Sequence, residues 1–462
     1  MTLIKSISGI RGTIGGAQGE NLTPIDAVKY AAAYGAWVKQ QRNKETHRVV
    51  VGRDARISGE MIQQLVMNTL VGMGITVIDL NLSTTPTVEM AVVMEHADGG
   101  IILTASHNPK QWNALKLLNN KGEFLNAAEG QKILDLAGAG DIDFAEVDHL
   151  GEIHKNDAYI DMHIDEILDL PLVNVEAIKS CGFKVVVDGV NSTGGIAIPL
   201  LLEALGVEPV KLYCTPNGEF PHNPEPLKEH LGDLMKMVVE DHADFGIVVD
   251  PDVDRLAFVD EKGEMFGEEY TLVAVADYVL QHTPGNTVSN MSSSRALRDV
   301  TEKHGKTYTA SAVGEVNVVE KMKATKAVIG GEGNGGIIYP ELHYGRDSLV
   351  GVALFLSFLA QERIAVSEIR KKYTAYFMSK KKIQLTPQLD VDGILKAMEA
   401  KYASEDINTI DGVKIDFAEN WVHLRKSNTE PIIRIYTEAK SQEEADALAD
   451  KIIGEIKGIA EV

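Results

Sequence analysis

The chain has 462 residues, 44% of them hydrophobic, so at roughly 150 residues per domain it is long enough for about three domains with separate cores. Its 45 lysines and arginines stand against 67 aspartates and glutamates, which gives a formal net charge of −22. Nucleic acids and anionic membranes are bound through basic residues, so we predict that this chain binds neither.

The chain contains two cysteines, Cys181 and Cys214. They are too few to cross-link several domains and are typical of a reducing compartment. No apolar run approaches the roughly 20 residues needed to cross a bilayer, and residues 1–16 lack the apolar centre of a signal peptide. We therefore predict a cytoplasmic protein of mixed α/β structure.

Three segments repeat one pattern along the chain: an apolar strand, a helical segment, a second strand, and a third strand that ends in a polar loop. The copies span residues 49–109, 185–254 and, more faintly, 287–336. Short apolar runs bounded by glycine and alternating with helices indicate largely parallel strands buried on both faces. Open α/β sheets bind ligands beyond the C-terminal ends of such strands, so the three polar loops are expected to converge on one cleft.

After about Tyr373 the pattern changes to one that is typical of an antiparallel sheet with helices on one side. The expected elements are strands at 380–385, 412–415 and 421–424, a helix at 391–402 and a closing helix from Gln442.

The fold class predicted from these patterns is three repeated mixed α/β domains plus a C-terminal α+β domain, arranged around a central cleft. The expected domains are residues 1–155, 156–260, 261–372 and 373–462.

Asp250, Asp252 and Asp254 stand at alternate positions directly after the apolar strand of the second copy. Such a carboxylate set can converge on one hard divalent cation. The segment is a poor EF-hand match, because Arg255 occupies the sixth position, where an EF-hand needs glycine. A solvated acidic turn is the alternative, but the buried strand before it favours a metal site, and we predict magnesium.

Ser106 follows the corresponding strand of the first copy and is a candidate nucleophile or phosphate carrier. The alternative is a turn whose polar residues bond the backbone. His107 directly follows Ser106, and because the side chain of a sequence neighbour usually points away from the serine, we do not expect His107 to be the base of a hydrolase triad. Lys116 is a candidate base if its amine is partly desolvated.

The C-terminal segment 425–434 combines two guanidinium groups, two hydroxyls and an amide. That mixture suits a phosphate dianion, although a salt-bridged surface turn is the alternative. The candidate phosphate ligands are Arg425, Ser427, Asn428, Thr429 and Arg434.

The glycine-rich segment 330–336 closes the third copy. It has neither the spacing of a dinucleotide-binding loop nor the lysine of a P-loop. Its carboxylate and amide, from Glu332 and Asn334, are suited to sugar hydroxyls.

Taken together and in this order, the motifs resemble those of the α-D-phosphohexomutase family over essentially the whole chain. Residues 8–12, with Arg11, are similar to the N-terminal signature of that family. Residues 104–109, 250–255, 332–334 and 425–434 are similar to its phosphoserine, metal, sugar and phosphate loops. The resemblance implies three mixed α/β domains and a C-terminal domain around a central cleft.

Two positions depart from the family pattern. Many members read Glu-x-Ser-Gly-His in the sugar loop, whereas this chain has Asn334 for the serine and Gly336 for the histidine. Any role of that histidine therefore does not carry over. Ala114 stands where a glycine usually precedes the lysine that corresponds to Lys116. The altered sugar loop is more similar to that of phosphoglucosamine mutases than to that of phosphomannomutase/phosphoglucomutases.

The resemblance implies phosphoryl transfer between C6 and C1 of a hexose, with hexose phosphate as substrate and hexose 1,6-bisphosphate as intermediate and activator. Phospho-Ser106 would give its phosphate to the sugar and receive the opposite one. Magnesium would be held by the three aspartates and a phosphoserine oxygen. The groups implied to orient the phosphate and move a proton are Arg11, His107, Lys116 and Arg255, with Lys116 as the implied base.

We predict interconversion of glucosamine 6-phosphate and glucosamine 1-phosphate. The alternatives are a phosphomannomutase/phosphoglucomutase, a metal-dependent sugar phosphatase, and a sugar-phosphate-binding protein without chemistry, against which the retained Ser106 and aspartates argue. The hexose, the general base, the oligomeric state and the first phosphorylation of Ser106 stay open. Because the substrate is an anion, the cleft is expected to be locally positive, lined by Arg11, Arg53, Lys116, Arg255, Arg425 and Arg434.

Overall fold

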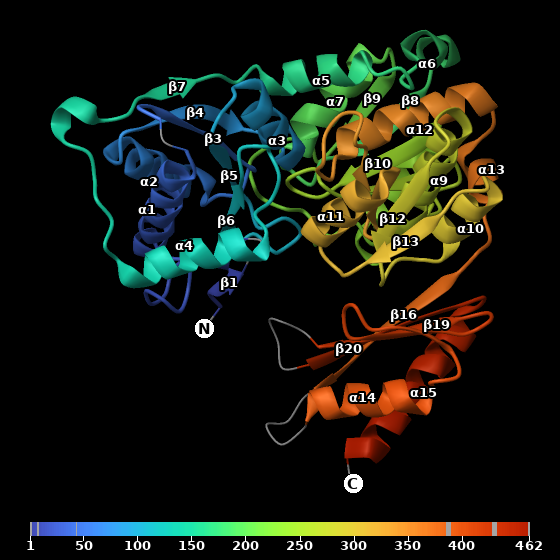
Figure 1. The fold of residues 1–462 in the computed structure, drawn as a ribbon. Helices are drawn as coiled ribbons and strands as arrows, with labels where there is room; N and C mark the ends of the chain where they lie inside the picture. The colour runs from blue at the N-terminus through green and yellow to red at the C-terminus, as the bar shows by residue number, and fades with distance from the viewer. Residues whose placement is uncertain (1, 7–8, 43, 385–389, 427–431, 461–462) are drawn as a thin grey trace.

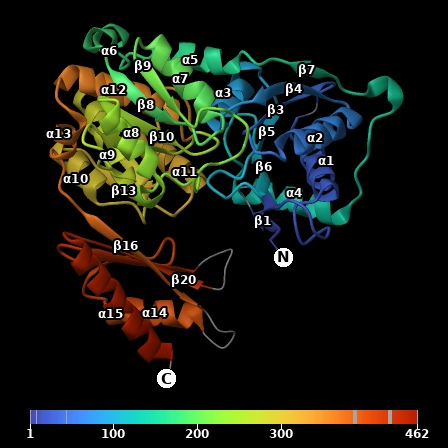
Figure 2. The ribbon, with the colours of Figure 1, turned by 180° about the vertical axis from the view of Figure 1, so that it is seen from behind.

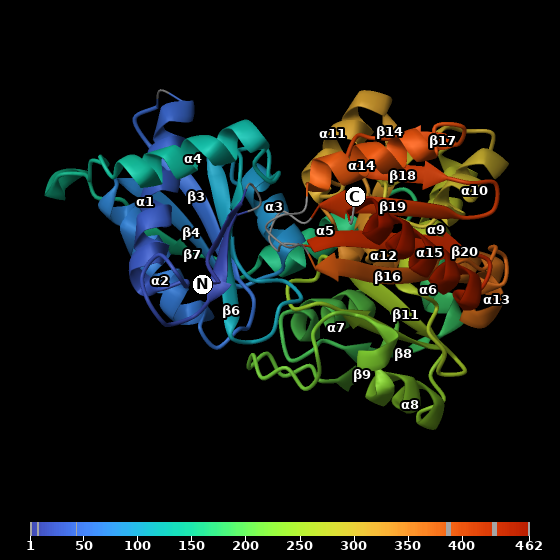
Figure 3. The ribbon, with the colours of Figure 1, turned by 90° about the horizontal axis from the view of Figure 1, so that it is seen from below.

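The computed structural model describes residues 2–6, 9–42, 44–384, 390–426 and 432–460. Figure 1 shows an N-terminal unit in blue beside a central body coloured green to orange, with a C-terminal unit in red below that body. The view from behind shows the same three masses (Figure 2). Seen from below, the C-terminal unit lies over the central body rather than over the N-terminal unit (Figure 3).

The N-terminal unit is a seven-stranded sheet with strand order β1-β2-β6-β5-β3-β4-β7. Residues of α1, α2 and α4 pack on one face, and α3 packs on the other, so the central strands are buried on both sides. The strands are β1 (Ile4–Ser6), β2 (Gly9–Thr13), β3 (His47–Arg53), β4 (Ile75–Leu82), β5 (Gly99–Leu103), β6 (Trp112–Leu118) and β7 (Ile153–Lys155). The helices are α1 (Pro24–Gln41), α2 (Gly59–Gly72), α3 (Thr85–Met94) and α4 (Ala127–Ala139), with a 3-10 turn at Val147–His149.

The central body contains two four-stranded sheets, ordered β11-β10-β8-β9 and β13-β12-β14-β15. The first has β8 (Lys184–Asp188), β9 (Glu208–Leu212), β10 (Phe245–Val249) and β11 (Leu256–Asp260), with α5 (Tyr159–Leu168), α6 (Val175–Cys181), α7 (Gly194–Ala204), α8 (Gly232–Glu240) and a 3-10 turn at Lys228–His230. The second has β12 (Asn286–Asn290), β13 (Tyr308–Ser311), β14 (Ala327–Glu332) and β15 (Gly336–Ile338), with α9 (Glu268–His282), α10 (Ala296–Lys303), α11 (Glu315–Thr325), α12 (Ser348–Glu362) and α13 (Val366–Arg370).

The three-fold repeat predicted from the sequence is confirmed, and the structure adds a strand to each copy. In every copy three strands run parallel in the same spatial order, β4-β3-β5, β9-β8-β10 and β13-β12-β14. A fourth strand, β6, β11 or β15, pairs antiparallel with the third. This hairpin turns the chain back at the polar loop, so each loop is fixed at both ends.

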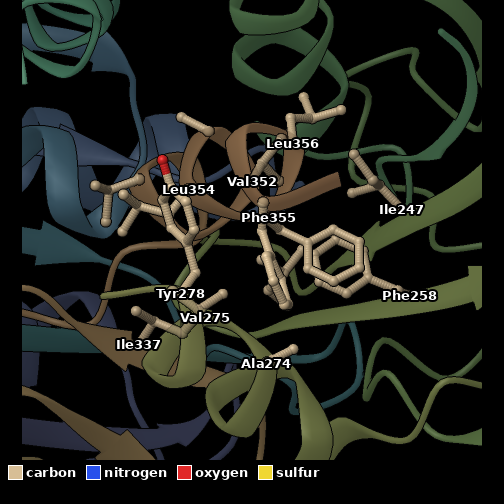
Figure 4. Close-up of a cluster of buried hydrophobic side chains, with 14 of the residues drawn as sticks. Ile247, Phe258, Ala274, Val275, Tyr278, Ile337, Val352, Leu354, Phe355 and Leu356 are labelled. Carbon is tan, nitrogen blue, oxygen red and sulfur yellow. The ribbon is translucent and has the colours of Figure 1, made fainter. Parts of the chain in front are cut away.

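One apolar core joins the two sheets of the central body. Helix α12 lies within it, and every residue from 348 to 360 is buried, so this helix is apolar on all sides. Figure 4 shows Phe355 against Phe258 of β11, with Tyr278 of α9 and Ile337 of β15 nearby, and the rings of Phe258 and Phe355 stack with centroids 4.0 Å apart. The second and third copies thus share one core, while the N-terminal unit has a core of its own.

The C-terminal unit is an antiparallel sheet ordered β16-β20-β19-β18-β17, as the sequence pattern predicts. Helices α14 and α15 share one core with it. Its contact with the central body includes Arg295, whose side chain reaches Asp416 at 3.3 Å, and Ser292, whose Oγ lies 2.9 Å from His423 Nδ1. The elements are β16 (Phe377–Gln384), α14 (Val391–Lys401), β17 (Asp406–Asn408), β18 (Val413–Asp416), β19 (Trp421–Lys426), β20 (Ile432–Ala439) and α15 (Gln442–Ala460).

In the part of the chain that the structure describes, no helix has both the length and the apolar character that crossing a membrane requires.

Candidate active site

The segment 104–109, which we call the serine loop, begins where β5 ends. Ser106 has φ +49°, a left-handed conformation that residues other than glycine rarely adopt. Its backbone N–H donates to Thr104 Oγ1 at 2.9 Å, and the Thr104 hydroxyl donates to Asp54 Oδ2 at 2.7 Å. Such a conformation costs free energy and persists only where the surroundings impose it, as at many functional sites.

Arg56 imposes that conformation, and the sequence analysis did not identify it. Its fully buried guanidinium pairs with Asp54 at 2.9 Å. The remaining donors go to backbone carbonyls that hold the serine loop, those of Ser106, Asn108, Pro109 and Trp112. The signal that could have found it is its position just beyond β3, the strand beside β5.

Arg53 was expected to line the cleft instead. Its guanidinium donates to Gln63 Oε1 at 2.9 Å and to Asn81 Oδ1 at 3.0 Å, which lie on α2 and β4. The structure therefore places Arg53 in contacts within the N-terminal unit.

Residues 250–255, the metal loop, follow β10 and face the serine loop. The Ser106 hydroxyl donates to Asp250 Oδ2 at 2.6 Å. Asp250, Asp252 and Asp254 are fully buried, and an oxygen of each lies within 4.8 Å of the others. Burial and the neighbouring carboxylates raise the pKa of Asp250 well above its usual value.

The donor set of this loop fits a metal ion. Asp252 Oδ1 and Asp254 Oδ1 are buried with no hydrogen-bond partner among the described residues. Unpaired buried carboxylate oxygens are costly, and a hard divalent cation satisfies them. Val253, between them, has φ +66°, which is strained for a β-branched residue and turns the flanking aspartates together.

Lys116 on β6 lies between the same aspartates. Its Nζ is 2.7 Å from Asp252 Oδ2 and 3.2 Å from Asp254 Oδ2, and the residue is only 5% exposed. Burial opposes the charge of this amine, but the two carboxylates outweigh burial and raise its pKa. The amine is therefore desolvated, as a base would need, and it holds its proton in this arrangement.

His107 is influenced by the charges of two nearby guanidinium groups. Burial, together with Arg255 and Arg11, lowers its pKa to about 2. Its Nδ1 is buried without a hydrogen-bond partner in the described part of the chain, while Arg11 donates to Asn108 Oδ1 at 2.8 Å and Arg255 pairs with Glu225 at 3.0 Å. The imidazole is therefore neutral, and burial and the two arginines disfavour its protonated form.

Residues 332–336, the sugar loop, connect β14 to β15. The Glu332 carboxylate accepts from Asn290 Nδ2 at 2.8 Å and from the Gly314 N–H at 3.2 Å, and pairs with Arg346 at 3.0 Å. Asn334 is partly exposed, and its Oδ1 accepts the Gly336 N–H at 3.2 Å. Arg346 was not identified from the sequence, because it lies outside every motif.

Two of the candidate phosphate ligands in the C-terminal unit face each other on neighbouring strands. Arg425 on β19 lies directly opposite Arg434 on β20, and Arg425 pairs with Asp411 at 3.5 Å. Like charges on facing strand positions repel, so an anion between them is favourable. Ser427, Asn428 and Thr429 lie outside the described residues, as does residue 8 of the N-terminal signature.

The chain matches four domain descriptions that together cover most of its length. Residues 3–141, 158–263 and 267–376 match the three alpha/beta/alpha domains of phosphoglucomutase/phosphomannomutase, and residues 379–455 match its C-terminal domain. The chain belongs to the phosphoglucomutase/phosphomannomutase family. The resemblance and the fold class predicted from the sequence are confirmed.

Relatives in this family align with this chain over nearly its full length. A phosphoglucomutase/phosphomannomutase of Thermococcus kodakarensis is 37% identical over 94% of this chain and 95% of its own. A probable phosphoglucosamine mutase of Methanopyrus kandleri is 31% identical over 98% of both chains. A crystal structure of a family protein from Burkholderia thailandensis superimposes with a TM-score of 0.85 at 25% identity, covering 100% of this chain and 98% of the other. The chain is accordingly a hexose phosphate mutase, as predicted.

Proposed function

We propose that this mutase interconverts glucosamine 6-phosphate and glucosamine 1-phosphate through a phosphoserine at Ser106 and a hexose 1,6-bisphosphate. The observation that carries the chemistry is the bond between the Ser106 hydroxyl and Asp250, within a buried cluster that has unpaired carboxylate oxygens. The variant sugar loop, with Asn334 and Gly336, supports the glucosamine preference. The same preference is supported by the relative from Methanopyrus kandleri that is named a probable phosphoglucosamine mutase.

The metal ion that we propose is magnesium, held by Asp250, Asp252, Asp254 and a phosphoserine oxygen. When bound, it would neutralise charge on the phosphate that moves. In the first step the bond from phosphorus to Ser106 Oγ breaks as a bond to the sugar oxygen forms. The bisphosphate then turns round, and its other phosphate returns to Ser106.

Each transfer to the sugar must also remove a hydroxyl proton. His107 and Lys116 are the two candidates to accept it. His107 is neutral, but with its pKa lowered to about 2 its ring is a weak base in this arrangement. Lys116, whose pKa the carboxylates raise despite burial, must first lose a proton. Arg11 and Arg255 are proposed to orient the phosphate, since charged forked donors suit phosphate oxygens.

The phosphate that is not transferred is assigned to Arg425 and Arg434, with Ser427, Asn428 and Thr429. Glu332 and Asn334 are proposed to contact the sugar. The facing positions of the two arginines support this assignment. We also propose that the enzyme works in the cytoplasm, where its two free cysteines would stay reduced. Domain boundaries near 155, 260 and 372 are part of the same proposal.

Competing assays with one preparation test the substrate. We expect kcat/KM for glucosamine 6-phosphate to exceed that for glucose 6-phosphate and mannose 6-phosphate by at least about tenfold, with magnesium and glucose 1,6-bisphosphate present. A preference for glucose or mannose phosphate would favour the alternative, a phosphomannomutase/phosphoglucomutase, to which the 37% identity of the Thermococcus kodakarensis relative points. Inorganic phosphate release at the rate of sugar turnover would identify a phosphatase instead.

A further inference from the structure

Arg346 joins three acidic groups that come from separate parts of the chain. It lies two residues before α12, and its side chain is about nine-tenths buried. Nη2 pairs with Asp254 Oδ2 at 2.7 Å, Nε with Glu315 Oε2 at 2.9 Å and Nη1 with Glu332 Oε2 at 3.0 Å. All three guanidinium nitrogens are therefore committed, in a fork that lysine cannot reproduce.

Two of these partners belong to the loops that carry the chemistry. Asp254 is in the metal loop and Glu332 is in the sugar loop, so one side chain spans the junction between the second and third copies. Arg346 and Lys116 both approach Asp254 at Oδ2, and Oδ1 is left buried and unpaired. The arginine thus fixes which oxygen of Asp254 is free.

A second observation, independent of the ion pairs, concerns the space beside Gly336. A Cβ placed on Gly336 would fall on Cδ of Arg346, so the arginine passes through the space where a side chain at 336 would begin. The backbone of Gly336 is not in the left-handed region, so conformation alone does not require glycine there. This is the position at which the resembling loops have histidine.

We infer that Arg346 is a positioning residue of the mutase reaction, which locks the sugar loop to the metal loop through Glu332 and Asp254 and replaces the side chain absent at 336. The inference rests on the proposed function. Arg346 acts through these two carboxylates, so its loss should disturb the alignment of sugar and phosphoserine more than substrate binding, which the distal phosphate supports elsewhere.

The first test is Arg346→Lys, which keeps a charge but removes the fork. Glucose 6-phosphate and glucosamine 6-phosphate serve as probes, with binding measured by calorimetry and turnover by coupled assay. We expect kcat to fall at least 30-fold while Kd stays within about threefold of the wild-type value. A kcat within threefold of wild type, or a fall in kcat matched by an equal rise in Kd, would overturn the inference.

The second test is Gly336→Ala, which removes no polar group and whose Cβ would displace Arg346 Cδ, at 2.3 Å, far more than Asn334 Oδ1, at 3.2 Å. We expect the same split, with kcat reduced at least tenfold and Kd nearly unchanged. Gly232→Ala is the matched control, since no atom lies within 4 Å of a Cβ there. If Arg346→Lys fails to fold, Gly336→Ala decides the matter, and a kcat within threefold of wild type overturns the inference.

The effects of Arg346→Lys and Gly336→Ala on kcat should not multiply in the double variant. In the Arg346→Lys background the lysine stem is free to move aside, so Gly336→Ala should lower kcat by less than a further threefold. Independent, multiplied effects would show that Gly336 and Arg346 do not act together. Failure of the proposed function is visible in the wild type, which would then not interconvert the two sugar phosphates, whereas failure of this inference is visible only in the variants.

Discussion

The carboxylates beside Ser106 are fully buried, whereas Arg425 and Arg434 on the C-terminal sheet are only partly buried. At the first end, loops from two sheets meet where the Ser106 hydroxyl donates to Asp250, and each loop contains a strained residue, Ser106 or Val253. At the second end, two facing strand positions present like charges from a single sheet. The two ends of the proposed substrate site are thus built in different ways.

The difference follows from what each end must do. Charge develops on the phosphate that moves, and fixed groups in a buried site stabilise such charge strongly because they need no rearrangement. The distal phosphate is bound in ground and transition states alike, whether it is on C1 or C6, so its site contributes binding without fine alignment. Changes at the first end should therefore lower kcat, and changes at the second should raise KM.

The largest effect is expected for Ser106→Ala. Without the hydroxyl no phosphoserine forms, and activity should fall by roughly 10⁴-fold or more, as on removal of other nucleophiles. Intact-mass analysis should show one phosphate on the wild type and none on the variant. Ser180→Ala, at an exposed serine of α6, is the control. Full activity of unphosphorylated wild type without any bisphosphate activator would refute the assignment.

Asp252→Asn should remove magnesium-dependent activity, by roughly 10²-fold or more, because a charged ligand of the proposed ion is lost. The structure also predicts a cost in stability. Asp252 pairs with buried Lys116 at 2.7 Å and accepts from Thr85 Oγ1 at 2.5 Å, so the metal-free variant should lose about 1.5–3 kcal/mol of unfolding free energy.

Asp250→Asn is the matched comparison for that cost. Asp250 accepts from the Ser106 hydroxyl and from two backbone N–H groups, and no lysine pairs with it in the described structure. Its replacement should abolish metal dependence with less loss of stability in urea unfolding with EDTA. Unchanged magnesium dependence in both variants would contradict the metal site.

Arg425→Ala should act on binding. Losing one charged hydrogen-bonding partner costs about 1.5–3 kcal/mol, which is roughly ten- to a hundredfold in affinity. KM should rise for the 1-phosphate and for the 6-phosphate alike, with kcat less affected. Lys440→Ala is the control, because Lys440 pairs with Glu419 on the same unit. A large defect for only one isomer would show that this is not the shared phosphate site.

The sequence allowed the three-strand copies and their closing loops to be placed, because apolar strands bounded by glycine carry a local signal. The antiparallel strand that follows each loop was missed, and β15 is only three residues long. The loops met as expected, since each follows the third parallel strand of its sheet.

Arg56 and Arg346 were missed for a different reason. Each acts on residues far along the chain, Arg56 on the serine loop some 50 residues later and Arg346 on Asp254, 92 positions before it. No local pattern marks such a residue. Arg53 and Arg56 are three positions apart and have similar sequence context, yet only Arg56 reaches the loop, which the fold alone decides.

The last prediction concerns stability rather than activity, at Glu269 of α9, beneath the sugar loop, where the central body meets the C-terminal unit. A Cβ on Gly333 would fall on its carboxylate, which accepts the Ser294 N–H at 2.8 Å. Burial raises the pKa of Glu269 to about 8, although Lys380 of β16 partly offsets burial, and Glu268 and Glu438 add to the rise.

A raised pKa fixes the sign of the pH dependence. Between the ordinary value of 4.5 and about 8, the folded protein holds a proton that the unfolded chain has released, so this group makes stability fall as pH rises through that window.

Glu269→Gln keeps the shape and the acceptor without the charge. The unfolding free energy of Glu269→Gln relative to the wild type should therefore increase between pH 5 and pH 8, by on the order of 3 kcal/mol at about 1.4 kcal/mol per pH unit. Above pH 8 this difference should become constant. Thermal unfolding at the two pH values measures it. Glu268→Gln is the control, since Glu268 is the neighbouring residue and its carboxylate lies 3.8 Å from Lys380 Nζ. Equal effects of Glu269→Gln at both pH values would mean that the Glu269 carboxylate is charged throughout and that its pKa is not raised.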